Sequence, residues 1–141
     1  MELTAELLKQ EARNHYGTEG YVLHGLMKNL FLTSGVCWLR ERANCFWLID
    51  AIASHQPEVK KDPMLREFQL WELKKDPEGE GEHSAILICS RDTDDPVITQ
   101  KIPYTDFPLD DEGFNFYAEP GVAGVNGKET VLPVLMLPSE R

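Results

Sequence analysis

The 141-residue sequence has little of what several protein classes require, beginning with cysteine and long apolar runs. Its three cysteines are an odd number without a C-x-x-C spacing, which predicts free thiols in a reducing compartment rather than a disulfide framework. No window approaches the roughly 18 apolar residues of a membrane span. The first residues, MELTAELLKQEAR, lack the basic and apolar regions of a secretory signal. We therefore expect a soluble, cytoplasmic protein with no membrane partner.

Basic residues are also scarce, because 14 Lys and Arg stand against 24 Asp and Glu, for a formal net charge of −10. A polyanion of this kind repels phosphate backbones at long range, so direct nucleic-acid binding is disfavoured. An acid surplus serves solubility in many proteins. It also suits an acidic face that docks on a protein with a basic surface.

The first half of the sequence predicts helices. Thr4 is expected to cap a helix that reaches about Arg13, and Thr33 or Ser34 to cap a second one over residues 35–43. Asn44 suits the left-handed backbone that follows a helix end. The stretch N-C-F-W-L-I-D-A-I-A-S-H-Q-P (residues 44–57) predicts a third helix, ended by its proline. Residues 15–32 are expected to form a loop with at most one short helix.

The second half predicts strands. Residues 68–74, 84–89 and 97–102 are rich in β-formers, and polar, turn-rich segments connect them as in an antiparallel meander. Short strands are expected at 114–118 and 131–137, and Pro133 directs the last one towards a sheet edge because it lacks a ladder donor. The order predicts a single α+β domain over residues 1–141, with a helical half (about 1–57) and a strand-rich half (about 64–141). We expect a four- to five-stranded, mostly antiparallel sheet with helices packed on one face.

The helix expected over residues 44–56 is apolar almost all round, which predicts a buried helix. Cys45 and His55 are ten residues apart in the sequence, or about 15 Å along a helix axis. A nucleophile and its base must come within about 3 Å, so this pair is not a catalytic one. Cys45 is expected to act as a small buried hydrophobe.

Asp50 is the unusual residue of this helix, because a buried carboxylate must be paired or hydrogen-bonded. One interpretation is a salt bridge to Arg40 or Arg42, or a bond to a backbone amide or a Tyr hydroxyl. The other is an acid in a pocket beside the aromatic side chains of Phe46 and Trp47.

The loop G-V-A-G-V-N-G-K-E-T (residues 121–130) invites comparison with a phosphate-binding loop. Val122 stands where the first glycine is required, and Glu129 stands where Ser or Thr is required. A strand is expected to follow rather than a helix, so no helix N-terminus is available for phosphate. The segment is interpreted as a flexible loop between two strands.

Metal and cofactor sites are not predicted. The acidic turns at residues 91–95 and 110–113 carry carboxylates of the kind that Ca²⁺ binds, but without the spacing of an EF-hand, and Asp stabilises turns by itself. The histidines have no metal-ligand spacing; they are His15, His24, His55 and His83.

The segment Y-T-D-F-P-L (residues 104–109) predicts a compact loop after the third strand. Its polar side chains, Tyr104 and Asp106, are candidates for lining a pocket. Together with Trp47, Asp50 and Ser54, they define a possible ligand-binding or enzymatic pocket between the 44–56 helix and the 104–109 loop.

Four segments, taken in order, resemble a family of small uncharacterised proteins from cyanobacteria and other bacteria that carries a domain-of-unknown-function label. The segments are F-W-L-I-D-A-I-A-S-H-Q (46–56), F-Q-L-W-E-L-K (68–74), Y-T-D-F-P-L (104–109) and L-P-S-E (137–140). The resemblance runs from about Thr33 onward. It implies a single stand-alone domain and brings no activity and no functional residues.

The main functional hypothesis is a non-enzymatic interaction or accessory module that acts through an acidic surface. It rests on the charge and on the lack of a convincing catalytic set, which leaves the enzyme question open but favours a non-enzyme. The alternative is the small-ligand pocket described above. A homodimer along the edge strand that contains Pro133 is compatible with either.

Overall fold

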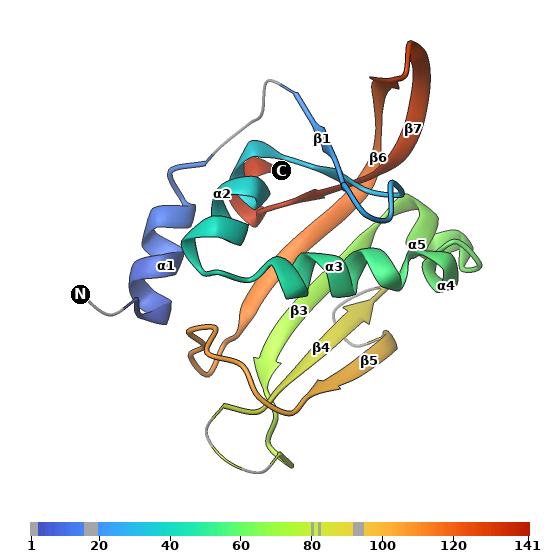
Figure 1. Ribbon diagram of the computed structural model, residues 1–141. Helices are drawn as coiled ribbons and strands as arrows, with labels where there is room; N and C mark the ends of the chain where they lie inside the picture. Colours follow the sequence, from blue (N-terminus) through green and yellow to red (C-terminus); the bar gives the residue numbers. More distant parts are fainter. Residues whose placement is uncertain (1–2, 16–19, 80, 82, 92–94) are drawn as a thin grey trace.

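The computed structural model describes residues 3–15, 20–79, 81, 83–91 and 95–141. Within these residues one seven-stranded sheet has the order β1-β2-β7-β6-β3-β4-β5; α3 crosses in front of it, and α1 lies to its left (Figure 1). The helices are α1 (Ala5–Ala12), α2 (Ser34–Arg42), α3 (Phe46–Ser54), α4 (Gln56–Val59), α5 (Pro63–Glu67) and the 3-10 helix η1 (Pro138–Glu140). The strands are β1 (Val22–Leu23), β2 (Phe31–Leu32), β3 (Gln69–Lys75), β4 (Ala85–Ser90), β5 (Pro96–Ile102), β6 (Phe114–Val125) and β7 (Lys128–Met136). None of the described helices has the length and apolarity of a membrane span.

The predicted α+β class is confirmed, but the expected sheet of four to five mostly antiparallel strands is wrong. The described sheet has seven strands and is mixed, because β2 runs parallel to β7. Both β1 and β2 come from residues 15–32, which were expected to form a loop. Leu32 and Leu135 pair in the main core, whereas Phe31 and Val134 pair in a second cluster. Strand β2 has only two residues, and both are buried, so its sequence shows no alternation of apolar and polar residues from which a strand could be predicted.

A second correction concerns residues 121–130, which were expected to form a flexible loop. Strands β6 and β7 continue through them as a hairpin whose turn is Asn126-Gly127. The turn residues have φ angles of 51° and 78°, and two successive positive φ angles define the type I′ turn that Asn-Gly favours. The Asn-Gly pair was therefore a hairpin signal. Residues 120–133, here called the β-arm, project beyond the other strands (Figure 1).

Pro120 and Pro133 lie opposite each other at the base of the β-arm. In a two-residue hairpin the pair next to the turn, Val125 and Lys128, exchanges hydrogen bonds, and bonded and non-bonded pairs then alternate. The two prolines fall on a non-bonded pair, so their nitrogens point away from each other and the hairpin loses no bond. Pro120 and Pro133 instead lack N–H donors on the outward-facing sides of β6 and β7. The pairing of β6 with β3 and of β7 with β2 stops near these prolines. Pro133 thus marks the point at which β7 becomes an edge.

The helix starts follow the predicted local signals. The Thr4 hydroxyl accepts a hydrogen bond from the Leu7 amide at 3.1 Å, and the Thr33 hydroxyl accepts one from the Val36 amide at 3.2 Å. Asn44 has a φ of 49°, as expected after a helix end.

Helix α3 starts at Phe46 with no side-chain cap. Its buried residues are Leu48, Ile49, Ile52 and Ala53. Burial of each large aliphatic side chain contributes about 1.5–3 kcal/mol, so packing against the sheet, rather than capping, holds this helix. In β3 the residues that face the helices, Gln69, Trp71 and Leu73, are buried, and the alternate residues are only partly buried.

The segment at residues 137–140 connects α1, α2 and the last strand, which gives the L-P-S-E sequence a structural role. The Glu140 carboxylate accepts hydrogen bonds from the Thr33 hydroxyl at 2.6 Å and from the Gly35 amide at 3.1 Å. A carboxylate is stabilising at this position because the helix N-terminus is positive. The Ser139 hydroxyl donates to the Ala12 carbonyl at the end of α1, at 3.0 Å.

Candidate functional site

Asp50 has a partner that the sequence did not predict. Its Oδ1 lies 2.7 Å from Nε2 of His24, a side chain that is 2% exposed. The other ring nitrogen, Nδ1, accepts a hydrogen bond from the Met27 amide at 3.1 Å. Since Nδ1 accepts, the ring proton is on Nε2 and is donated to Asp50. Both ring nitrogens are occupied, so neither is free to take a proton from a substrate.

The expected salt bridge from Arg40 or Arg42 to Asp50 is wrong. The Arg42 guanidinium instead bonds Oε1 of Glu11 at 2.9 Å, and this hydrogen bond lowers the pKa of the Glu11 carboxyl. Arg40 lies over the ring of Phe46, 4.8 Å from its centroid. These contacts connect α1 to α2 and cover the start of α3.

The other candidate residues on α3 also have local roles. Phe46 is 43% exposed, so the helix is less completely buried than its apolar sequence predicted. Trp47 is half-buried against the main core. Ser54 is exposed, and its hydroxyl donates to the Ala51 carbonyl of the same helix at 2.6 Å.

A buried polar network fixes the C-terminal end of α3 on the sheet. Gln56 and Gln69 exchange two side-chain hydrogen bonds of 3.0 and 3.1 Å. The Trp71 indole donates to the same Gln69 oxygen at 2.8 Å, and a ring nitrogen of His55 lies 2.6 Å from the Gln100 side-chain oxygen. Buried polar groups are costly unless bonded, so these residues specify how α3 sits on β3 and β5. Four of them fall in the 46–56 and 68–74 segments on which the family resemblance rests.

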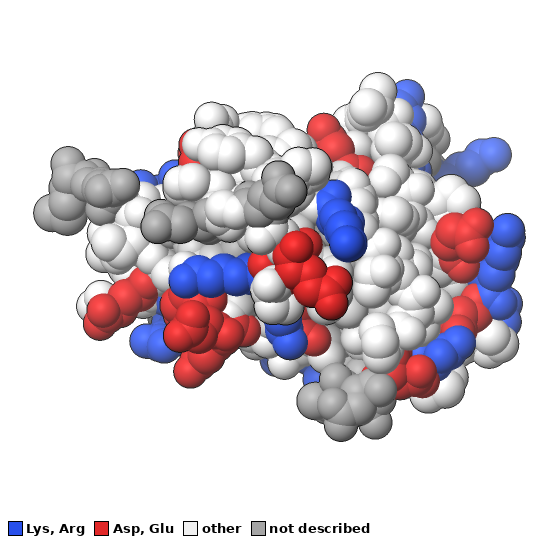
Figure 2. Space-filling view, turned by 90° about the horizontal axis from the view of Figure 1, so that it is seen from below, with Lys and Arg blue, Asp and Glu red and all other residues white. Residues whose placement is uncertain are grey.

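Tyr104 and Asp106 lie elsewhere, on the loop between β5 and β6. This loop and the β3–β4 turn leave the same end of the sheet, since successive antiparallel strands reverse direction. We call this region the acidic end. Its described carboxylates are Glu6, Asp76, Glu78, Asp106, Asp110, Asp111 and Glu112. The linings of its two pockets contain five acids, Glu6, Asp76, Asp106, Asp110 and Glu112, and three bases, Lys9, Arg13 and Lys75. Figure 2 shows acidic side chains at the lower left of the molecule, the side on which α1 lies in Figure 1, as well as in the centre and at the right edge.

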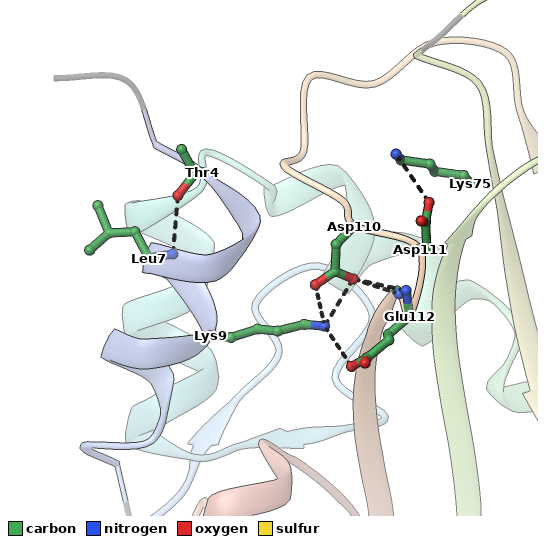
Figure 3. Close-up of polar contacts among 8 residues, drawn as sticks. Thr4, Leu7, Lys9, Lys75, Asp110, Asp111 and Glu112 are labelled. Atoms are coloured by element: carbon green, nitrogen blue, oxygen red, sulfur yellow. Dashed lines mark hydrogen bonds and ion pairs between the residues drawn. The ribbon is translucent and has the colours of Figure 1, made fainter.

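Asp110 organises the loop of the acidic end (Figure 3). Its carboxylate accepts hydrogen bonds from the Lys9 ammonium at 2.8 Å and from the Glu112 and Gly113 amides at 3.0 Å each. The bond from Lys9, followed by the charge of Lys9 and the two amides, lowers the pKa of Asp110. The neighbouring carboxylates of Asp111 and Glu112 are exposed. Their nearest lysine ammonium groups, of Lys75 and Lys9, lie 3.7 Å away, which is too far for a strong hydrogen bond. Asp110 therefore holds the loop, and its neighbours are accessible.

A surface pocket of about 620 Å³ lies between the β3–β4 turn and the β5–β6 loop. Its polar and charged lining includes Lys75, Asp76, His83, Ser84, Thr105 and Asp106, and its apolar lining includes Leu3, Pro77, Phe107, Pro108 and Leu109. The Thr105 amide donates to the His83 carbonyl at 2.8 Å, which joins the two loops. The ring of Tyr104 lies 5.1 Å from the ring of His83.

The structure therefore places the predicted site residues in two different surroundings. Asp106 lines the 620 Å³ pocket and Tyr104 contacts one of its lining residues, whereas Trp47, Asp50 and Ser54 do not line this pocket. The sequence analysis missed Lys75, Asp76 and His83. The available signal was topological, because two polar connectors of an antiparallel meander emerge at the same end of the sheet.

The cysteines are unpaired thiols, and two of them, Cys45 and Cys89, are buried. The described cysteines are free, as predicted. Burial raises the pKa of Cys45 and of Cys89 to about 12, so neither supplies a thiolate at neutral pH. No group of three or more His, Cys, Asp or Glu among the described residues is arranged to hold a metal ion. Residues 92–94 of the first acidic turn lie outside the described residues.

Fold and site together define a small α+β protein whose buried polar residues position α3 and whose accessible carboxylates gather at one end of the sheet. The profile of a family of unknown function, DUF6876, matches residues 6–141, and the chain belongs to this family. The resemblance to a domain-of-unknown-function family is thereby confirmed. No match was found among curated proteins or among solved structures.

Proposed function

We propose that this protein is a non-enzymatic interaction module that binds a basic protein surface through its acidic end. The observation that carries the proposal is the excess of carboxylates at the acidic end, where the linings of the two pockets contain five acids against three bases. Asp106, Asp111 and Glu112 are exposed there.

The loops that present these carboxylates are held in place by the described contacts of Asp110 and Thr105. A preorganised loop loses little conformational entropy when it binds. Charges of one sign on such a surface steer a partner of the opposite sign and suppress partners of the same sign. At physiological ionic strength the screening length is about 8 Å, so a basic partner must contact this end directly.

The test compares two variants with the same change in net charge. The first neutralises the acidic end with Glu78→Gln, Asp106→Asn, Asp111→Asn and Glu112→Gln, and leaves Asp110 and Asp76 intact because both bond backbone amides of their turns. The matched control neutralises four exposed carboxylates elsewhere with Glu41→Gln, Glu58→Gln, Glu67→Gln and Glu129→Gln.

Affinity capture from a lysate of the source organism, with the wild-type chain and both variants as bait, should recover a basic protein. Calorimetric titration with that protein should then show at least a tenfold weaker affinity for the acidic-end variant, since four exposed ion pairs of about 0.3–1 kcal/mol each are lost. The control variant should bind as the wild type does. Equal affinities of the two variants would contradict the proposal.

A second candidate function is the binding of a small ligand in the 620 Å³ pocket. Apolar walls with a few convergent polar groups, here Lys75, His83 and Asp106, are the usual composition of such sites. Native mass spectrometry of the protein gently purified from its source should then show a bound small molecule. The variants His83→Ala and Asp106→Asn should lose it, whereas the exposed-site variant Glu58→Gln should retain it.

A further inference from the structure

Strand β6 has an open edge at its beginning. Its pairing with β7 ends at Tyr117 and Met136, so residues 114–116 have no described strand on that side. Tyr117 and Met136 belong to the bonded pairs that alternate from the hairpin turn, and Asn115 is therefore the next residue whose backbone N–H and C=O point to the open side. The same register would place Pro138 opposite, and proline has no N–H. The Asn115 carbonyl thus lacks a ladder donor on this side.

A pocket of about 200 Å³ lies at this open edge, between α1, the start of β6 and η1. Its charged lining residues are Lys9, Arg13 and Glu112, and its apolar ones are Ala12, Phe114 and Pro138. Asn115 also lines it. Sites for drug-sized molecules have volumes of about 300–1,000 Å³, so this pocket suits a smaller ligand with both charged and apolar groups.

Two polar groups of this pocket have unused bonding capacity. The side-chain oxygen of Asn115 is buried and has no hydrogen-bond partner among the described residues. A buried acceptor is costly unless a donor reaches it. The Arg13 guanidinium is exposed, and it makes no hydrogen bond or ion pair within the described part of the chain. Lys9, by contrast, already bonds Asp110 (Figure 3). The pocket therefore lacks an N–H donor at Asn115 and an anion at Arg13.

The charges around the pocket decide which anion fits. The carboxylates of Glu112 and Asp110 lie beside it and would repel a dianion such as phosphate. A carboxylate carries a single charge, and a guanidinium binds it through two parallel hydrogen bonds. A ligand that joins a carboxylate to a neighbouring N–H group would satisfy both Arg13 and Asn115. This pair of groups is the main-chain end of an amino acid.

We propose that the pocket binds the α-carboxylate and α-nitrogen of an amino acid, with the carboxylate on Arg13 and the N–H group on Asn115. An apolar side chain of the ligand packs against Phe114 and Pro138. The same chemistry has two sources. A free amino acid carries an ammonium group that Glu112 also attracts, whereas the last residue of a peptide carries an amide N–H, and its chain continues along the open edge of β6.

The test titrates ¹⁵N-labelled protein with L-leucine, N-acetyl-L-leucine and L-leucinamide, and with the same three forms of alanine and phenylalanine, and follows the amide resonances. The carboxylate-bearing compounds should shift the Gly113 and Asn115 resonances. The amides lack the carboxylate and should bind at least about tenfold more weakly, because charge-assisted hydrogen bonds are lost. No shift at these resonances with any compound would overturn the proposal, and so would equal binding of the amides.

The same titration distinguishes the two sources. A site for free amino acids should prefer the unmodified compound, and Glu112→Gln should weaken its binding. A site for a peptide C-terminus should prefer the N-acetyl compound, and Glu112→Gln should leave its binding unchanged.

Two variants with the same change in charge test the role of Arg13. Arg13→Gln should weaken binding at least about tenfold, whereas Arg66→Gln, at an exposed position of α5, should bind as the wild type does. Equal binding by both variants would overturn the proposal. Arg13→Gln makes the chain more acidic and should not weaken the binding of a basic protein, so this result is separate from the test of the acidic end.

Asn115→Val gives a second readout that a purely structural asparagine would not give. It removes the unpartnered amide and adds a residue that favours strands, so the protein without ligand should melt at a higher temperature than the wild type. The variant should nevertheless bind the amino acid at least about tenfold more weakly. Wild-type binding by this variant would contradict the role of Asn115.

Discussion

The imidazole of His24 donates its Nε2 proton to Oδ1 of Asp50 at 2.7 Å, which connects the turn between β1 and β2 to the middle of α3. A second side chain strengthens the connection, because the Asn29 amide donates to the Ala53 carbonyl at 3.0 Å. Asp50 thereby changes from a candidate pocket acid to the acceptor that satisfies a buried histidine. Asp50 therefore helps to position the β1–β2 hairpin on α3.

Removing the Asp50 acceptor should destabilise the protein. Asp50→Ala leaves the buried Nε2 proton of His24 unbonded, and we expect the free energy of unfolding to fall by about 1–3 kcal/mol. Asp50→Asn keeps an acceptor oxygen and should lose less. Urea unfolding measures both. Ser54→Ala, an exposed change on the same helix, is the control. If Asp50→Ala is no worse than Ser54→Ala, the His24 bond contributes nothing to stability.

The substitution Gly35→Ala should destabilise the protein, although alanine in place of glycine stabilises most helices. Alanine is favoured over glycine by about 1 kcal/mol inside a helix, but a Cβ at Gly35 would lie 2.5 Å from Oε1 of Glu140. We expect Gly35→Ala to lower the unfolding free energy by about 1 kcal/mol because the bonded carboxylate is displaced. In a Glu140→Ala background the same change should be neutral or stabilising. Thermal unfolding of all four combinations tests this, and equal effects in both backgrounds would refute it.

The exchange of hydrogen bonds between Gln56 and Gln69 should be sensitive to loss of either partner. Gln56→Met keeps the side-chain length but leaves the buried side-chain NH2 of Gln69 without its acceptor, for an expected loss of about 1–3 kcal/mol. Gln10→Met, at an exposed position of α1, is the matched control and should change stability by less than about 0.5 kcal/mol. Urea midpoints give the comparison. Similar midpoints for both variants would mean that the amide pair is not important for stability.

The carboxyls with a lowered pKa, which include Asp62 and Asp110, should govern the decline of stability at acid pH. Hydrogen bonds from Arg91 lower the pKa of Asp62, and those from Lys9 lower the pKa of Asp110. A carboxyl with a lower pKa in the folded state stabilises fully above its unfolded value of about 4, and this contribution is lost as the pH falls through the folded value. We expect the unfolding free energy contributed by these groups to be constant between pH 7 and about pH 5 and to decline below about pH 4.

The variant Asp62→Asn tests this because asparagine still caps α5, whereas the charge beside Arg91 is removed. It should be less stable than the wild type at pH 7 and should lose less stability between pH 5 and pH 3, as measured by urea unfolding at each pH. Asp111→Asn, at an exposed position, is the control with the wild-type profile. A parallel decline for Asp62→Asn and the wild type would contradict the assignment.

The cysteines should differ in reactivity. Because burial raises the pKa of Cys45 and Cys89 to about 12, neither should react with iodoacetamide at pH 7.5 in the folded protein. Burial also raises the pKa of Cys37, but this thiol is only half-buried, and the charge of Arg40 opposes the effect. Mass spectrometry after alkylation should show modification at Cys37 first and at all three after denaturation. Rapid modification of Cys45 in the folded protein would reveal a more open α3.

Local signals predicted a large part of the fold. Thr4 and Thr33 cap the helices that they were expected to cap, and Asn44 has the expected positive φ, because capping and backbone sterics act over a few residues. The strands predicted at 68–74, 84–89 and 97–102 lie within one residue of β3, β4 and β5. A strand of six or seven residues repeats the alternation of buried and exposed positions several times, so its apolar pattern can be recognised in the sequence.

The wrong predictions have two causes. Some segments form strands only with partners far away in the sequence, and one local turn signal was misinterpreted. Phe31 and Leu32 form a strand between β1 and β7, and β7 lies about a hundred residues later in the chain. The Asn126-Gly127 turn was a local signal, but the glycine-rich sequence around it was interpreted as a loop. The residues of the predicted pocket lie in two separate places because their partners are distant in the sequence. Asp50, for example, bonds His24, which the β1–β2 hairpin places beside α3.

The sequence by itself determined the helix caps, the main strands, the buried α3 and the acid surplus, because each depends on neighbouring residues or on composition. Only the tertiary structure decided which polar groups meet. It paired Asp50 with His24 and Gln56 with Gln69, and it placed the carboxylates of two separate connectors at one end of the sheet. The physical reason is that burial fixes which faces turn inward, whereas the partner of a polar group is set by the crossing of elements far apart in the chain.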